Sequence, residues 1–145
     1  MFMILSFFAG VAIATTATLN AYLGQLLASS LLATCIAFVS GSFFTITGYI
    51  YYTKEYPTLQ IIKTVPIYLW FTGGVLSAFA LASFYYLIPK IGILPMLSFS
   101  LGGQLLFSVV SGHFGLFGLP QTSVTIEKLV GVAFMLLAIY LINKG

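Results

Sequence analysis

Charged residues are scarce in this 145-residue sequence. It contains no arginine and no aspartate, and its five lysines and two glutamates give a net charge of +3. Charged residues are 5% of the chain, whereas a soluble domain has roughly a quarter. A chain of this composition cannot cover a water-facing surface, so a lipid bilayer is its expected solvent. The five scattered lysines form no basic patch, and nucleic acid is therefore not an expected partner.

Cysteine and histidine are also nearly absent. The sequence has one cysteine, Cys35, and one histidine, His113. A single cysteine allows no disulfide within the chain and no Cys/His metal cluster. There is no Ser/His/Asp set and no phosphate-cradling glycine loop, so we expect neither an enzyme nor a cofactor.

Apolar residues dominate the chain. They make up 61% of it, and the mean hydropathy is +1.14. One membrane span needs about 20 apolar residues, which predicts a single all-α transmembrane domain over residues 1–145. Five helices are expected, at about residues 3–27, 31–52, 66–88, 92–112 and 124–142. The first run has no Lys or Arg ahead of it and continues to Leu27, so a transmembrane helix is favoured over a signal peptide.

The connections between the spans add local predictions. The short link 28–30 requires an antiparallel hairpin of the first two spans. Residues 58–63 are expected to form a short helix on the membrane surface, and Pro89 is expected to close the third span. Lys128 lies so close to the fifth apolar run that its ammonium group must reach back toward the headgroups.

A polar stripe runs along the fourth span. Its members are spaced four, four and three residues apart on one helical face: Ser100, Gln104, Ser108 and Ser111. A carboxamide is costly to leave facing lipid, so Gln104 should face other helices or a cavity. Pro95 and the Gly102–Gly103 pair weaken the backbone ladder. A bendable helix with a polar face is expected to line a path.

Three residues of other spans are further candidates for binding a substrate. Asn20 follows Thr16 by one helical turn, and it either hydrogen-bonds a neighbouring helix or lines the same path. Trp70 either anchors the third span at the membrane interface or stacks on a ligand. No carboxylate lies at membrane depth, where carriers of cations usually place one. A small neutral or zwitterionic substrate is therefore favoured over a simple organic cation.

Two titratable side chains lie at the membrane edge. His113 is either an interfacial residue bonded to water and headgroups or a proton-responsive gate. Glu127 falls in the first turn of the fifth span, where the helix dipole favours a negative charge. Small residues recur at spacings suited to close helix packing, and we expect packing roles for Gly10, Gly24, Gly41, Gly74 and Gly103.

The lysines barely bias the orientation of the chain. With five spans, Lys54, Lys63 and Lys128 lie on one side of the membrane, whereas Lys90 and Lys144 lie on the other. By the positive-inside rule, the side with more positive residues stays in the cytoplasm, and a difference of three lysines against two is a weak bias. One hypothesis is that the chain inserts both ways up and forms an antiparallel homodimer, an inverted repeat made from two chains. The alternative is that one orientation dominates.

With these residues in view, the sequence resembles the YdcZ-type inner-membrane proteins, a five-span branch of the drug/metabolite transporter superfamily. The resemblance runs almost end to end and is carried by the following segments: Gly10, Leu19–Gly24, Gly73–Gly74, Pro89–Gly92, Gly103–Leu105, His113–Leu116 and Glu127–Gly131. It implies a bacterial plasma-membrane exporter with a five-helix repeat, one half of an inverted-repeat fold.

Two positions depart from the family pattern. The family often has an acidic residue just before His-Phe-Gly, where this chain has Gly112, and a Gln-like group about one turn before Asn20, where it has Thr15 or Thr16. The combined prediction is an alternating-access exporter that works as an antiparallel homodimer in the membrane lipid. The alternatives are a helper subunit of a hetero-oligomeric transporter and a small channel.

Overall fold

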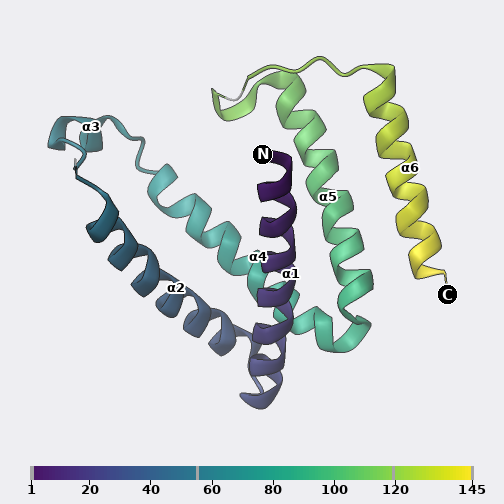
Figure 1. Ribbon diagram of the computed structural model, residues 1–145, viewed down its shortest axis with the longest axis horizontal. Coiled ribbons are helices and arrows are strands. Elements are labelled where there is room, and N and C mark those ends of the chain that lie inside the picture. The colour runs from purple at the N-terminus through teal and green to yellow at the C-terminus, as the bar shows by residue number, and fades with distance from the viewer. Residues whose placement is uncertain (1, 55, 119, 145) are drawn as a thin grey trace. The chain divides into compact units, whose positions relative to one another are not determined.

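The structure, a computed structural model, describes residues 2–54, 56–118 and 120–144. Over these residues the chain is 85% helix with no strand. Five helices are long and apolar enough to cross a membrane: α1 (Phe2–Leu26), α2 (Ser30–Tyr52), α4 (Leu69–Ile91), α5 (Ile93–Phe114) and α6 (Ile126–Asn143). The described residues form two further short elements, α3 (Leu59–Thr64; Figure 1) and the 3₁₀ turn η1 (Leu116–Gly118). The predictions of an all-α fold with five spans and of a short helix near residues 58–63 are confirmed.

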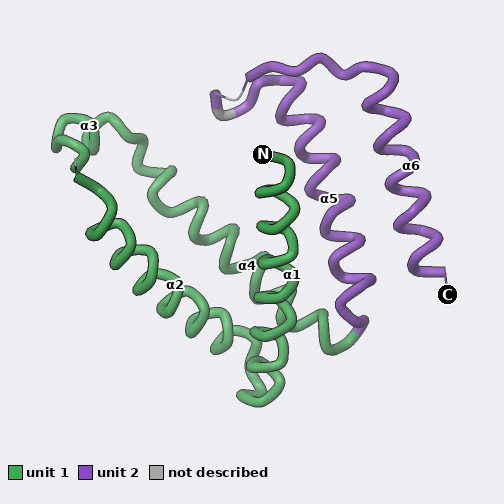
Figure 2. The backbone as a smooth tube through the Cα atoms, in the orientation of Figure 1, with its two compact units in different colours: residues 1–90 green, residues 91–145 purple. Residues whose placement is uncertain are grey.

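The chain forms two compact units, which are described separately. The first, residues 1–90, contains α1 to α4, and the second, residues 91–145, contains α5, η1 and α6 (Figure 2). In both units most large apolar side chains are exposed; Phe79 of α4 and Phe134 of α6, for example, are 74% and 66% exposed. Such surfaces are stable against lipid or against further apolar helices, not against water.

The first two helices of unit 1 form the predicted antiparallel hairpin. Residues 27–29 connect them, and the Ser29 hydroxyl caps α2 by accepting a hydrogen bond from the Leu32 amide at 3.2 Å. Gly24 lets the helices approach closely, because a Cβ built there would lie 3.4 Å from the Ser30 Cα and 3.5 Å from the Ala33 Cβ.

Tyr85 anchors the small core of unit 1. It comes from α4, is 2% exposed and packs with Ala21 of α1 and Ala33 of α2. Two of these three buried residues are alanines, whose small side chains leave room for one large ring. The core therefore joins α1, α2 and α4 near the α1–α2 turn.

The prediction that Pro89 ends the third span is wrong. α4 begins at Leu69, after a turn in which the Leu69 amide bonds the Pro66 carbonyl, and it continues through Pro89 to Ile91. A proline in the last turn removes one hydrogen bond, and the helix can continue past it. The break comes at Gly92, whose φ of +86° is readily adopted only by glycine.

Unit 2 is a hairpin of α5 and α6 held at three levels. At the loop end the Thr122 amide donates to the Gly112 carbonyl at 2.8 Å. In the middle, a Cβ built on Gly102 would lie 2.9 Å from the Ile139 Cδ1. At the far end the Asn143 side-chain amide donates to the Ser98 hydroxyl at 3.0 Å. The absence of a side chain at Gly102 thus sets the distance between the two helices.

Replacing Gly102 with leucine is expected to destabilise unit 2 by about 1–3 kcal/mol, the usual cost of overpacking a contact. The matched control is Gly103→Leu, because a Cβ on this neighbouring glycine meets no atom within 4 Å. The apparent melting temperature of each variant in detergent micelles is the measurement. Equal melting temperatures for the two variants would show that the close α5–α6 contact is not present.

Candidate functional site

Asn20 and Tyr85 form a polar contact between α1 and α4 in unit 1, near the α1–α2 turn. The Asn20 side-chain amide on α1 donates to the Tyr85 hydroxyl on α4 at 3.1 Å. Asn20 is half-buried and Tyr85 is buried. The interhelical hydrogen bond, one of the two roles considered for Asn20, is therefore present. A role in substrate binding stays a prediction.

Removing the Tyr85 hydroxyl isolates the contribution of this bond. Tyr85→Phe keeps the ring and should lower the stability of the protein by about 0.6 kcal/mol, the average for polar contacts between membrane helices. Tyr140→Phe makes the same chemical change at a tyrosine that is 59% exposed and should leave stability unchanged. Unfolding in a denaturing detergent gives both values. A Tyr85→Phe protein as stable as the Tyr140→Phe protein would argue against the bond.

Gln104 and Ser100 form a second polar pair, in unit 2. The Gln104 side-chain amide donates to the Ser100 hydroxyl at 2.9 Å, and Gln104 is exposed. One turn further along, the Ser111 hydroxyl donates to the Ser108 carbonyl at 3.3 Å. The predicted polar stripe on α5 is thus partly linked along its own helix.

The polar pair lies on the face of α5 that is turned away from α6. Gly102 marks the face that contacts Ile139 of α6, and two residues along an α-helix correspond to a rotation of about 200°. Gln104 therefore projects nearly opposite to α6. Its carboxamide retains unused hydrogen-bonding capacity on this face, since an amide has two donor hydrogens and an acceptor oxygen.

The other predicted binding residues lie in unit 1. Thr16 of α1 and Trp70, in the first turn of α4, are both exposed. The candidate residues are thus divided between the two units: Asn20, Thr16 and Trp70 in the first, and the Ser100–Gln104 pair with Ser108 in the second. That they share one cavity stays a prediction.

The two titratable candidates lie at the same end of unit 2, where α5 ends and α6 begins. His113 is exposed, and its ring meets that of Phe114 edge-on at 5.0 Å. Glu127 lies in the first turn of α6, as predicted, and Thr125 caps that turn. The Lys128 ammonium donates to the Ser123 carbonyl at 2.7 Å, in the connection that precedes α6; that it reaches the headgroups stays a prediction.

One of the five glycines predicted to pack helices lies at a close contact within this chain. Gly24 lies at the α1–α2 crossing, whereas a Cβ on Gly10, Gly41, Gly74 or Gly103 meets no atom of the described residues within 4 Å. Packing at these four positions would need a further partner and stays a prediction.

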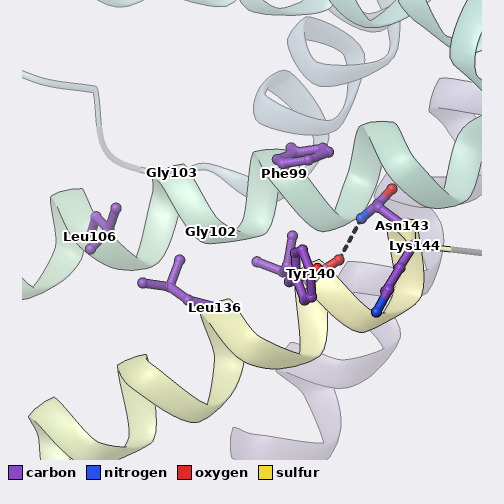
Figure 3. A pocket seen from close by; sticks show the side chains of 9 residues that line it. Phe99, Gly102, Gly103, Leu106, Leu136, Tyr140, Asn143 and Lys144 are labelled. Atoms are coloured by element: carbon purple, nitrogen blue, oxygen red, sulfur yellow. Dashed lines mark hydrogen bonds between the residues drawn. The ribbon is translucent and has the colours of Figure 1, made fainter.

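Sequence reasoning missed Tyr85 and the Ser98–Asn143 pair. The partners of the two interhelical bonds are 65 and 45 residues apart, so no local spacing pointed to either. Asn143 also borders a groove of about 490 Å³ between α5 and α6 (Figure 3). Leu106 and Leu136 lie toward one end of this groove, and Tyr140 and Lys144 toward the other.

The five long apolar helices, with all lysines near helix ends or in connections, define a multi-pass α-helical membrane protein. The chain belongs to the YdcZ family: residues 1–141 match the family model described as "Putative inner membrane exporter, YdcZ". The resemblance seen in the sequence is thereby confirmed, and the protein is a multi-pass protein of the inner membrane. No curated protein and no solved structure matches the chain.

Proposed function

We propose that this protein exports a small neutral or zwitterionic molecule by alternating access, as an antiparallel homodimer. The observation that carries the proposal is the Gln104–Ser100 pair on the exposed face of α5. An exposed carboxamide in a membrane helix needs polar surroundings, because lipid offers no hydrogen-bond partners. A substrate path formed with other helices would supply them.

The chemical character of the polar groups supports the substrate class. The polar side chains in the helix bodies are amides and hydroxyls, and the two interhelical bonds join such groups. The lysines lie near the ends of the five long helices or between α2 and α4, and Glu127 is in the first turn of α6. Neutral groups can bind a neutral or zwitterionic molecule by hydrogen bonds, whereas a buried cation would need a carboxylate.

The small size and the exposed apolar faces of the chain support a second copy. Five helices are few for enclosing a substrate cavity, and many transporters build their site at the interface of two inverted repeats. Three lysines against two permit insertion both ways up. Two copies of opposite orientation would bring the Gln104 faces of their α5 helices to one central path. Energy coupling, if the carrier uses protons, would act through His113 or Glu127.

Flux into inside-out membrane vesicles tests the proposal. We would measure uptake of three radiolabelled probes: glucose, which is uncharged, glycine, which is zwitterionic, and tetraphenylphosphonium, a cation. Vesicles containing the protein should accumulate an uncharged or zwitterionic probe above vesicles without it, with saturation and counterflow. Flux that does not saturate would instead indicate a channel. Flux only in the presence of a second protein would indicate a helper subunit.

A further inference from the structure

The groove between α5 and α6 has features of a binding site for a membrane lipid. Its volume is about 490 Å³, within the range of small-molecule sites, roughly 300–1,000 Å³. The Gly102–Gly103 pair forms part of its lining, and apolar side chains such as Phe99, Leu106 and Leu136 form much of the rest (Figure 3). Because the protein lies in a bilayer, the apolar molecules that surround the groove are lipid acyl chains.

The length of the groove matches one lipid leaflet. Along α6 the groove extends from Leu136 to Lys144, and eight residues rise by about 12 Å. Half of the hydrocarbon core is about 15 Å thick. α6 ends at Asn143, which puts Lys144 at the membrane interface and Leu136 near the midplane. A single acyl chain anchored at Lys144 would therefore fill the groove.

The polar end of the groove favours an anionic headgroup. The Lys144 ammonium lies 5.8 Å from the centre of the Tyr140 ring, and no described residue that lines the groove is acidic. The Asn143 side-chain oxygen is buried and accepts no hydrogen bond from the described residues. A phosphate would pair with the lysine.

We propose that the α5–α6 groove binds one phosphatidylglycerol molecule, with its phosphate at Lys144 and one acyl chain along the Gly103 side of α5. This assignment uses the membrane location of the chain and is independent of transport. Phosphatidylcholine fits less well, because it has no net charge and its headgroup has no hydrogen-bond donor.

Native mass spectrometry of the purified full chain, titrated with phosphatidylglycerol or phosphatidylcholine, tests the site. The wild type should bind one phosphatidylglycerol per chain more tightly than phosphatidylcholine. Lys144→Gln should weaken this binding about fivefold, the contribution of one lysine to binding an anionic lipid. Lys128→Gln, which removes a lysine near the other end of α6, should leave it unchanged.

Gly103→Leu provides a test of the groove itself. A leucine at this position would fill the groove without meeting any atom within 4 Å of its Cβ, so the variant should fold normally and lose the bound lipid. Equal binding of the two lipids, equal losses in the two lysine variants, or full lipid retention in Gly103→Leu would each overturn the proposal. A groove covered by a second copy would appear as a lipid-free dimer, and that result would overturn it too.

Discussion

Replacing Gln104 with leucine is expected to reduce transport at least about tenfold while the protein still inserts into the membrane. Leucine has a similar size and removes both the donors and the acceptor of the carboxamide. If the substrate is held by two hydrogen bonds from this group, at about 1 kcal/mol each, their loss corresponds to more than about a tenfold change in affinity. The substitution also replaces a polar group by an apolar one in a membrane helix, so insertion should not suffer.

The matched control for this variant is Gln121→Leu. It makes the same chemical change in the connection between η1 and α6, outside the long helices. Initial rates of saturable uptake into inside-out vesicles, divided by the amount of inserted protein, give the comparison. Gln104→Asn, which keeps the amide on a shorter side chain, should have intermediate activity. Normal flux through the Gln104→Leu protein would show that the exposed face of α5 does not line the path.

The positions of the five spans could be predicted because a membrane span has a simple physical requirement. Each needs about 20 apolar residues with its charges at the ends. The five apolar runs lie before Lys54, between Lys63 and Lys90, between Lys90 and Lys128, and after Lys128. The hairpin of the first two helices was also predictable, since the short link at residues 28–30 leaves no other geometry. Gly92 rather than Pro89 marks the α4–α5 break, because a proline in a last turn removes only one bond.

The rotation of each helix about its axis could not be predicted in the same way. A soluble helix reveals its buried face by one apolar stripe, whereas these helices are apolar all round. Sequence spacing therefore favoured Gly103 as a packing residue, although the close contact with Ile139 is made by Gly102. The Asn20–Tyr85 and Ser98–Asn143 bonds were missed for the same reason. The polar residues of α5 do not mark a single face, because Ser98 bonds Asn143 of α6 whereas Gln104 is exposed. That the stripe lines a path stays a prediction.

A variant that inserts in only one orientation is expected to lose transport, because it cannot form the antiparallel homodimer. Transport should return when two variants fixed in opposite orientations are expressed together. Lys90→Gln with Gln121→Arg shifts the balance of positive residues to four against one and should hold the chain one way up. Lys54→Gln and Lys63→Gln with Ile91→Arg shift it to one against three and should hold it the other way up. These counts follow from the five lysine positions and the positive-inside rule.

Reporters fused after Gly145 establish the orientations, one reporter active only in the cytoplasm and the other only outside it. The unaltered chain should activate both, and each fixed variant only one. Alone, each fixed variant should lose transport by about tenfold or more, because the inverted partner that completes the cavity is missing. When the two variants are expressed together, transport should be restored. Twice the amount of either variant alone should not restore it. Full transport by one fixed variant alone would mean that the path does not require copies of opposite orientation. The Gln104 face would then have to contact helices of the same chain or of a copy in the same orientation.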